Sequence, residues 1–340
     1  MSKYNNIIRH FKGKRLLVIG DVVLDQYIKG SVSRISPEAP VPIVLQEESF
    51  FTPGGAANVA NNLASLGADV TLVSKIGDDI EGNILKRELV KRHIRTTGIF
   101  IDSAIDTIFK TRIIAQHQQI VRLDREKPSK TGLDLIKEGK IFPFLRRHLK
   151  EFQAVIISDY GKGVIDTRLL AHVHELALRY KLPLVVDPKS EDLREYGQVN
   201  CITPNKKEAE AALKNISEET RKAFGIRSTK LDDKEDIENN GCGLLNYLGI
   251  ESILITLGEH GMYLFERNKK PFPIPTMARQ VFDVSGAGDT VISVFALCLA
   301  AGADKSQAAE IANYAAGIVV GKMGAVAVGL DELKQAIGAK

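Results

Sequence analysis

Apolar and polar positions alternate along the chain with two different periods. Short apolar runs rich in β-branched residues have the pattern of buried strands, and longer segments between them repeat apolar residues at helical spacing. This alternation predicts an α/β fold with a doubly wound, mainly parallel sheet flanked by helices, in which the carboxyl ends of the strands border the ligand crevice. The expected strands are 16–19, 70–74, 154–158, 184–187 and 252–256, and the expected helices are 56–66, 80–92, 136–149, 168–180, 236–248 and 291–301.

Two segments interrupt this alternation. Residues 26–51, which contain several prolines, and residues 107–125 have the pattern of antiparallel strands that lie away from the main sheet. They predict a small β-lid inserted in a single domain that spans 1–340. Segment 215–238 is charged and poor in apolar residues, so we expect its first half to be a surface insertion or mobile loop without catalytic chemistry.

Composition narrows the class of protein. Of the 340 residues, 44% are hydrophobic and 26% are charged, which is typical of a globular protein with a sizeable core. A net charge of +4 with mixed signs gives no electrostatic footprint for a nucleic acid or membrane partner. Three widely spaced cysteines predict neither disulfides nor a zinc site. The amino terminus lacks the apolar centre of a secretory signal, so we expect a cytoplasmic protein.

A glycine-rich turn at 283–290 directly precedes the last of the expected helices. Small residues let backbone amides converge at a helix start, where the dipole favours an anion such as a transferring phosphoryl group. We therefore expect the amides of Gly286, Ala287 and Gly288 to bind that group. Asp289 is then placed to accept the proton of an attacking hydroxyl, with its pKa lowered by the helix terminus. The alternative is a capped helix without a catalytic role.

A second cluster of small residues, 54–60, also opens a predicted helix. Gly54 and Gly55 would let the backbone approach a sugar, and the amide of Asn58 can donate and accept at a hydroxyl. Two such junctions in one chain indicate a single site that both of them border. Purely structural glycines are the alternative.

Polar residues follow three of the expected strands at their carboxyl ends. Asp21 and Asp25 follow the first strand, where carboxylates can accept hydrogen bonds from sugar hydroxyls, although aspartate also favours turns. Asp159 and Lys162 follow the third strand and are further candidates for the substrate. Lys189 follows the fourth strand and is a candidate for nucleotide phosphates, although each lysine can equally be an ordinary surface residue.

The two small-residue clusters read GGA-x-N-x-A and D-x-x-GAGD, and with them the chain resembles the ribokinase-like (PfkB) sugar kinases over roughly 14–329. The resemblance implies phosphoryl transfer from ATP with Mg²⁺, and a sugar hydroxyl held by Asp25. It also implies a lid that closes over the sugar and pairs with a second subunit, so we expect a homodimer. Val23 stands where ribokinase itself has asparagine, which makes simple ribokinase activity less expected.

An N-x-x-E element at 205–208 corresponds to one in these kinases. The resemblance implies that Glu208 helps to order Mg²⁺ through water, and that Asn205 faces the nucleotide phosphates, with Lys206 and Lys207 beside it. A hard cation that keeps its waters needs few protein ligands, which is compatible with one glutamate. A helix cap with a capping-box glutamate fits the same spacing equally well.

The resemblance assigns two further elements. A T-x-G-x-x-G loop and a helical asparagine would contact the nucleotide, although taken alone the first is a turn and the second a structural amide. Beside the glycine-rich turn, relatives can hold a monovalent cation such as K⁺ through carbonyl oxygens. The residues concerned are Thr256, Gly258, Gly261 and Asn313 for the nucleotide, and Asp283 and Ser285, with loop 321–325, for the cation.

Four longer strings resemble kinases that convert D-glycero-β-D-manno-heptose 7-phosphate to the 1,7-bisphosphate, for the ADP-heptose of lipopolysaccharide. A phosphorylated acceptor needs cations at its far end, and the lid contains several, which can equally be solvated surface charges. Such kinases often occur fused to a nucleotidyltransferase with an H-x-G-H motif. None occurs here, so we expect a stand-alone kinase or isolated kinase domain, without a nucleotidyltransferase domain. The strings are 20–25, 34–42, 158–163 and 283–291, and the lid cations are Arg34, Lys110, Arg112 and Arg122.

Three other functions are weighed against this one. Another PfkB kinase, acting on a different sugar or sugar phosphate, would share the residues above. An NAD-dependent oxidoreductase would have a similar sheet, but no G-x-G-x-x-G follows the first strand. A catalytically silent sugar-binding regulator would keep Asp25 and Asn58 but lose Asp289 or its glycines, whereas both sets are intact.

Overall fold

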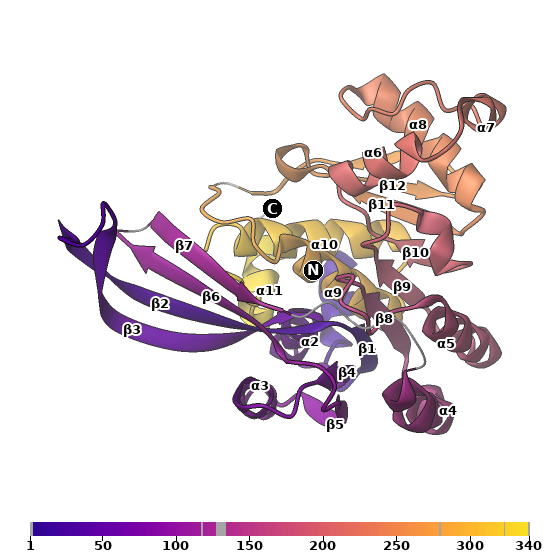
Figure 1. Ribbon diagram of the computed structural model, residues 1–340. Helices are drawn as coiled ribbons and strands as arrows, with labels where there is room; N and C mark the ends of the chain where they lie inside the picture. The colour runs from indigo at the N-terminus through magenta and orange to yellow at the C-terminus, as the bar shows by residue number, and fades with distance from the viewer. Residues whose placement is uncertain (1–2, 117, 127–133, 279, 323, 339–340) are drawn as a thin grey trace.

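The computed structural model describes residues 3–116, 118–126, 134–278, 280–322 and 324–338. Within these residues, strands form a nine-stranded sheet in the body of the protein and a four-stranded sheet, the lid, that projects from it (Figure 1). Helices pack around the larger sheet, and the lid extends away from them as a long blade (Figure 1).

The larger sheet is doubly wound and mainly parallel, as the sequence predicts. It contains β1 (Arg15–Gly20), β4 (Asp69–Ile76), β5 (Arg95–Ile101), β8 (Ala154–Ser158), β9 (Leu184–Asp187), β10 (Cys201–Ile202), β11 (Ser252–Thr256), β12 (Met262–Glu266) and β13 (Phe272–Ile274). The strand order is β13-β12-β11-β10-β9-β8-β1-β4-β5, and only β12 and β13 are antiparallel to their neighbours. Chain order reverses between β1 and β8, so the ligand crevice of this topology lies at their carboxyl ends.

The lid is confirmed and is larger than predicted. It contains β2 (Val22–Ile35), β3 (Pro42–Gly55), β6 (Ile108–Ala115) and β7 (Gln118–Arg125), while His117 lies outside the described residues. β2 pairs antiparallel with β3, and β6 with β7, but β2 and β6 are parallel, which the sequence did not indicate. Because β2 begins directly after Asp21 and the edge strand β3 ends at Gly55, two of the four lid strands start or end beside residues predicted for the site.

Helices cover both faces of the larger sheet and bury alternate residues of its strands. They are α1 (Lys3–Arg9), α2 (Ala56–Ser65), α3 (Ile80–Lys91), α4 (Phe142–His148), α5 (Thr167–Tyr180), α6 (Lys206–Lys214), α7 (Glu218–Ala223), α8 (Lys234–Leu248), α9 (Ala287–Ala300), α10 (Lys305–Val319) and α11 (Leu330–Gly338). Along β1, Leu16 and Val18 join a core with α2, α9 and α10. Leu17 and Ile19 join a second core with α5, α6 and α8, so the strand is apolar at every position.

The expected helix 136–149 is not a single α-helix. It starts with a π-helical turn, Lys137–Ile141, and continues as α4. Lys137 is 4% exposed, and its Nζ lies 2.5 Å from Oδ2 of Asp166 and 3.7 Å from Oδ2 of Asp134. The wider turn thus accompanies a buried ion-paired lysine on the core side, which a helical hydrophobic pattern does not reveal.

The first half of 215–238 lies mostly at the surface, as the sequence predicts, but it is not a loop throughout. Ser217 caps the short helix α7 by accepting a hydrogen bond from the backbone of Thr220. After this helix, Ile226 and Leu231 are buried against the second core. Buried apolar side chains, which include these two, and one helix cap therefore hold a segment in which half of the residues are charged.

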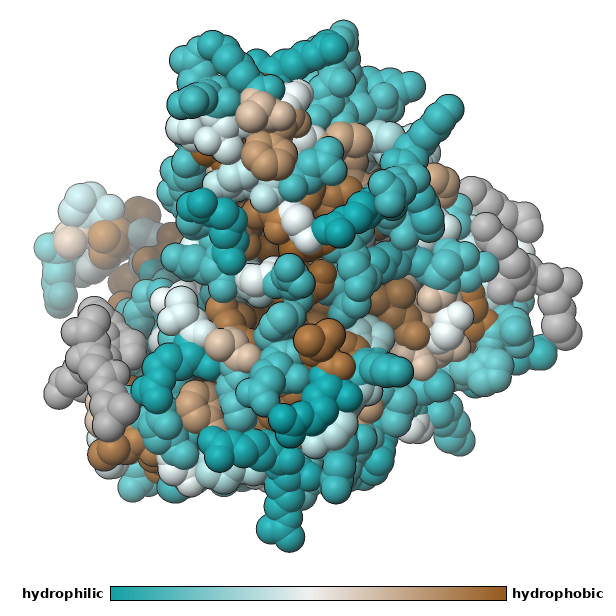
Figure 2. Space-filling model, turned by 90° about the vertical axis from the view of Figure 1, so that its right-hand side faces the viewer, coloured by the Kyte–Doolittle hydropathy of each residue, from teal (hydrophilic) through white to brown (hydrophobic). Residues whose placement is uncertain are grey.

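Hydrophilic residues cover most of the face shown in Figure 2, and apolar residues show mainly in the hollows between them. Among the helices of the described ranges, none is both long enough and apolar enough to cross a membrane.

Candidate active site

The two glycine-rich helix starts meet at the carboxyl edge of the main sheet. α2 begins after Gly55 and α9 after Gly286, with φ of 59° and 77°, in the backbone region that glycine adopts without strain. The amide of Ala287 donates to the carbonyl oxygen of Val284 at 3.2 Å. Within the described part of the chain, the amides of Gly286 and Gly288 have no such acceptor, so two of the three predicted donors are available to an anion.

Asp289, in the first turn of α9, is the buried carboxylate at the centre of this junction. Only 6% of the residue is exposed. Its Oδ2 accepts a 2.7 Å hydrogen bond from Nδ2 of Asn58, and its Oδ1 accepts one of 2.7 Å from the hydroxyl of Tyr160. Burial raises the pKa of Asp289 to about 6, although both hydrogen bonds oppose the rise.

The expectation that the helix terminus lowers the pKa of Asp289 is therefore wrong in direction. The helix dipole favours the ionised carboxylate, but the loss of water around a buried group has the larger effect. Asp289 is still ionised at neutral pH, and it is a stronger base than a solvent-exposed aspartate.

The loop after β8 is held in place by the carboxylate of Asp21, which is 1% exposed. Its oxygens accept hydrogen bonds from the backbone amides of Tyr160 at 3.1 Å, Lys162 at 3.0 Å and Val164 at 2.8 Å. Burial raises the pKa of Asp21, and these three bonds oppose the rise. Because backbone donors surround this carboxylate, the geometry favours a structural role for Asp21 over contact with a sugar.

Tyr160 was not predicted as a site residue, although it lies within the string 158–163. The available signal was a tyrosine two residues beyond a buried strand, next to Asp159. Which way its ring points depends on the three bonds to Asp21, and these connect segments more than 130 residues apart. Sequence spacing alone does not reveal that contact.

Asp159, Lys162 and Lys189 belong to a network that joins the loops after β8 and β9. Asp159 accepts hydrogen bonds from the amide of Gly161 and from the hydroxyl of Tyr196, both at 2.7 Å. The backbone amide of Lys189 donates to the same Tyr196 hydroxyl at 2.7 Å. Nζ of Lys162 lies 2.9 Å from Oε1 of a lid-end glutamate, Glu126. Their roles as ligands stay predictions.

Asp25 lies where the lid joins the body, and it is 6% exposed. The guanidinium of Arg112 forms an ion pair with Oδ1 of Asp25 and lies 5.3 Å from the ring centroid of Tyr27. A Cβ on Gly54 would lie 2.3 Å from Oδ2 of Asp25, so glycine is required for this approach. Arg112 is thus a partly buried, paired cation and not a solvated lid charge. Lys110 is less engaged, with Nζ 4.0 Å from Oδ2 of Asp124.

A hollow of about 610 Å³ adjoins the start of α9. Its walls are largely apolar, and Val281 and Val284, which are 60% and 67% exposed, contribute to them. Asn313 borders the hollow, and its amide donates to the carbonyl oxygen of Pro275 at 2.6 Å, so it also supports the wall. The other predicted residues that line the hollow are Ala287, Gly288, Lys206, Thr256, Gly258 and Gly261.

The N-x-x-E element forms the capping box that its spacing allows. Oδ1 of Asn205 accepts from the amide of Glu208 at 3.0 Å, and Oε2 of Glu208 accepts from the amide of Asn205 at 2.9 Å. Asn205, Lys207 and Glu208 do not line the hollow, whereas Lys206 does, with its Nζ 2.7 Å from Oδ1 of Asp232. Contact of the element with nucleotide phosphates stays a prediction.

Acidic charge is concentrated between this element and Asp289. No group of three or more His, Cys, Asp or Glu among the described residues is arranged to hold a metal ion. Burial raises the pKa of Asp187 well above its ordinary value, and the charges of Asp289 and Glu208 raise it further. Such an environment fits a hydrated Mg²⁺ that arrives with the phosphates and keeps most of its waters. Magnesium and the role of Glu208 stay predictions.

Asp283 organises the backbone beside the glycine-rich turn. Its Oδ1 accepts from the amide of Ser285 and its Oδ2 from the amide of Gly324, both at 2.9 Å. Although burial opposes them, these bonds hold the pKa of Asp283 below its usual value. Met323, within the predicted cation loop, lies outside the described residues. Binding of K⁺ near Asp283 and Ser285 stays a prediction.

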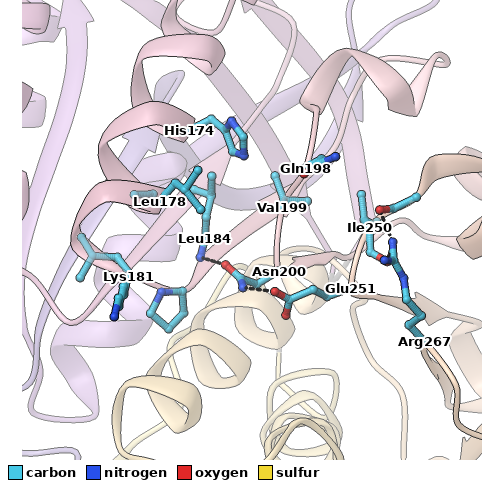
Figure 3. Close-up of a pocket in the computed structure, with 14 residues that line it drawn as sticks. His174, Leu178, Lys181, Leu184, Gln198, Val199, Asn200, Ile250, Glu251 and Arg267 are labelled. Carbon is cyan, nitrogen blue, oxygen red and sulfur yellow. Dashed lines mark hydrogen bonds between the residues drawn. The ribbon is translucent and has the colours of Figure 1, made fainter.

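A second hollow, of about 510 Å³, lies at the opposite edge of the sheet. Leu184 starts β9 and Glu251 precedes β11, so this hollow adjoins the amino ends of the strands. The side chain of Asn200 is already engaged there: it accepts from the backbone amide of Leu184 at 2.8 Å and donates to Glu251 at 2.9 Å (Figure 3). None of the predicted ligands lines it, and we assign it no role in catalysis.

Comparison with known proteins places this chain in a family. A family model described as pfkB family carbohydrate kinase matches residues 14–332. The chain is 43% identical over 324 residues to the bifunctional protein HldE of Desulfatibacillum aliphaticivorans, covering 95% of this chain and 63% of that protein. It is 41% identical over 333 residues to the bifunctional protein HldE of Geobacter sulfurreducens, covering 98% and 65%. The chain therefore spans just under two thirds of the length of these relatives.

Solved structures of low sequence identity share the fold. Phosphofructokinase-2 of Escherichia coli, in complex with substrates and products, has a TM-score of 0.75 at 16% identity, covering 96% of this chain and 99% of that one. Ribokinase of Arabidopsis thaliana, complexed with ribose and ATP, has a TM-score of 0.69 at 17% identity and the same coverage. The fold is thus ribokinase-like, and from the family match the chain belongs to the pfkB family of carbohydrate kinases and is a sugar kinase.

Proposed function

We propose that the protein transfers the γ-phosphoryl group of ATP, with Mg²⁺, to the anomeric O1 of D-glycero-β-D-manno-heptose 7-phosphate, a step toward ADP-heptose and the lipopolysaccharide core. The proposal rests on the position of Asp289. Its carboxylate contacts Asn58 beside the lid, while Ala287 and Gly288 line the hollow of about 610 Å³, which we take as the nucleotide site. In-line phosphoryl transfer is assisted by a carboxylate that lies between the sugar and nucleotide sites, where it can orient the attacking hydroxyl and accept its proton. Similarity to the HldE proteins supports heptose phosphate as the acceptor.

In this reaction Asp289 accepts the proton of the anomeric hydroxyl as the oxygen attacks the γ-phosphorus. Its pKa of about 6 makes it a better proton acceptor than an exposed aspartate while leaving it ionised at neutral pH. The amides of Gly286 and Gly288, at the positive end of α9, are placed to stabilise the phosphoryl oxygens. Magnesium, when bound, neutralises charge on the phosphates, and Glu208 would hold it through water.

The lid supports a phosphorylated acceptor. On neighbouring strands, Lys110 lies opposite Asp25, and Arg112 lies opposite Tyr27. Arg122 lies opposite Arg112 on the next strand, so three cations follow one another over adjacent positions of the lid. A 7-phosphate carries close to two negative charges at neutral pH, which such cations can offset with charge-assisted hydrogen bonds.

The lid also supports pairing with a second copy of the chain. Leu45 in β3 and Leu123 in β7 are 66% and 68% exposed. Covering such side chains removes apolar area from water, so we include a homodimer paired through the lids in the proposal. Sedimentation over a range of concentrations should show a dimer, and a monomer throughout would remove this part.

The test of the function is ATP consumption with Mg²⁺ across heptose 7-phosphate, fructose 6-phosphate, fructose 1-phosphate, ribose and adenosine. The variant Asp289→Asn supplies the background rate for each acceptor. We expect a strong preference for heptose 7-phosphate, with a new anomeric phosphate signal in ³¹P NMR of the product. Preference for another acceptor would favour the alternative, a PfkB kinase of a different sugar or sugar phosphate. Absence of turnover with every acceptor would contradict the proposal as a whole.

A further inference from the structure

The proposed reaction leaves one contact of Asp289 unused. The hydroxyl of Tyr160 donates a 2.7 Å hydrogen bond to Oδ1 of Asp289, the carboxylate that accepts the substrate proton. Tyr160 comes from the loop after β8, on the opposite side of the carboxylate from Asn58, which donates to Oδ2 at 2.7 Å. Each oxygen of the carboxylate therefore has one fixed donor from a different element.

We propose that Tyr160 is a positioning residue, whose hydroxyl holds the carboxylate of Asp289 in one orientation and in its ionised form, ready to accept the proton of the substrate hydroxyl. This inference rests on the proposed function, because it takes Asp289 to be the proton acceptor. It adds a residue from a third element to a site that the two glycine-rich helix starts otherwise build.

The geometry explains the positioning. A carboxylate held at one oxygen can still turn about its Cβ–Cγ bond, whereas donors on both oxygens fix its plane. Each oxygen keeps a second lone pair, so a substrate hydroxyl can still donate to the carboxylate. The loop itself is rigidly placed, because the carboxylate of Asp21 binds the amides of Tyr160 and Val164 at 3.1 and 2.8 Å.

The electrostatics give the direction of the effect. Burial raises the pKa of Tyr160 well above its ordinary value, and the charge of Asp289 raises it further, so the hydroxyl stays a donor across the working pH range. Its bond opposes the rise that burial imposes on the pKa of Asp289. The other ionisable groups around the pair are Asp25 from β2, whose charge is offset by Arg112, and Asp187 from β9. Removing the hydroxyl should therefore move the pKa of Asp289 upward.

The experiment is the pH dependence of kcat/KM for Tyr160→Phe beside the wild type, with ATP, Mg²⁺ and heptose 7-phosphate. We expect the acidic limb to move up by about one pH unit, since a hydrogen bond to a charged group is lost. We also expect kcat to fall about tenfold, with KM for the acceptor changed less than about twofold. Phosphates of the substrates titrate in the same range, but equally for every variant.

Tyr196→Phe is the matched control, because Tyr196 also donates its hydroxyl to a carboxylate of this loop, that of Asp159, at 2.7 Å. The acidic limb of the pH profile of Tyr196→Phe should stay at the same pH as in the wild type, whether or not kcat changes. An unchanged limb in Tyr160→Phe, or an equal shift in both variants, would show that Tyr160 acts only through loop structure. If Tyr160→Phe does not fold, 3-fluorotyrosine at position 160, a stronger donor, should move the limb to lower pH, and no movement would refute the inference.

A direct titration separates this inference from the proposed function. The carboxyl carbon of Asp289, in protein labelled with ¹³C at aspartate side chains, is assigned by the signal missing from Asp289→Asn. Its midpoint should be higher in Tyr160→Phe than in the wild type, and unchanged in Tyr196→Phe. If heptose 7-phosphate is not the acceptor, the proposed function fails while this titration still decides the role of Tyr160. Equal midpoints in all three proteins would overturn it.

Discussion

Nδ2 of Asn58 donates a 2.7 Å hydrogen bond to Oδ2 of Asp289, and this contact joins two helix starts that lie 231 residues apart in the chain. The contact continues along the two helices, where the hydroxyl of Thr290 donates to Oδ1 of Asn62 at 3.0 Å and that of Ser293 to the carbonyl oxygen of Val59 at 3.0 Å. The side predicted to bind the sugar and the side predicted to bind the phosphoryl group therefore form one packed unit.

Gly286 should tolerate no side chain, for two separate reasons. Its φ of 77° is costly for alanine, by about 1–2 kcal/mol. A Cβ there would also lie 2.8 Å from Nδ2 of Asn58 and would disturb the contact of Asn58 with Asp289. We expect Gly286→Ala to lower both the free energy of unfolding and kcat, the latter by at least about tenfold, as measured by denaturant melts and steady-state kinetics.

Gly302→Ala separates the two reasons. Gly302 has a φ of 90°, and an added Cβ would have no neighbour within 4 Å. It should therefore lose a similar amount of stability while keeping wild-type kcat. Equal losses of kcat in both variants would show that backbone strain, and not displacement of Asn58, accounts for the effect.

Asp289→Asn should separate activity from stability. Loss of the proton acceptor should lower kcat by about 10²–10⁴-fold. The pKa of Asp289 is raised to about 6, so the folded protein binds its proton more tightly than the unfolded chain does. The ionised carboxylate therefore costs stability, and this cost grows as pH rises from about 4 to 6. We expect the variant to be more stable than the wild type above pH 6, by up to about 3 kcal/mol.

Urea unfolding at pH 4 and at pH 7.5 tests whether Asp289→Asn or the wild type is the more stable. The difference in the free energy of unfolding between the variant and the wild type should be small at pH 4 and large at pH 7.5. A wild type that is the more stable at pH 7.5 would mean that the hydrogen bonds from Asn58 and Tyr160 outweigh burial, and that the pKa of Asp289 is not raised.

Asp289 and Tyr160 show which features of the site the sequence predicts and which it does not. Local periodicity predicts the strands and the lid segments, and turn chemistry predicts the two glycine-rich helix starts. The structure confirms that these two starts meet, through Asn58 and Asp289. The pKa direction of Asp289 depends instead on how much water the fold removes around it. Helix position predicted a lowering, whereas burial, which no local pattern encodes, produced a rise.

Asp21 shows the same limit of prediction from sequence, here for the role of a residue and not for its pKa. Its position after β1 predicted a sugar ligand, but its carboxylate holds the amides of a loop about 140 residues away, at Tyr160 and Val164. Aspartate after a strand serves either purpose, and the choice depends on which loop the sheet topology brings beside it. Here β8 is the neighbour of β1, so the loop after β8 supplies the donors.

Gly54 should be required by the carboxylate of Asp25. An added Cβ would lie 2.3 Å from Oδ2 of Asp25, whose Oδ1 is already paired with Arg112, so the carboxylate has to move. If Asp25 binds the acceptor, Gly54→Ala should raise KM for the acceptor about 10-fold or more and leave KM for ATP unchanged. Gly139→Ala is the control, since a Cβ there meets nothing within 4 Å, and its KM values should match the wild type.

Arg112 and Asp25 should behave as one unit in stability as well as in binding. The side chains of this ion pair are only 18% and 9% exposed, so removing either one leaves the other charge poorly solvated. We expect Arg112→Ala and Asp25→Ala each to lower the free energy of unfolding by about 3 kcal/mol. The double variant should lose much less than the sum, which gives a coupling energy of about 2 kcal/mol in a double-mutant cycle.

The pair of Arg122 with Asp124 provides the matched exposed case in the same lid. Its Nε to Oδ1 distance is 2.8 Å, but the arginine side chain is 48% exposed, so water already screens the two charges. The same cycle on Arg122→Ala and Asp124→Ala should give a coupling below about 0.5 kcal/mol. Equal coupling for both pairs would mean that burial at the lid base does not strengthen the contact.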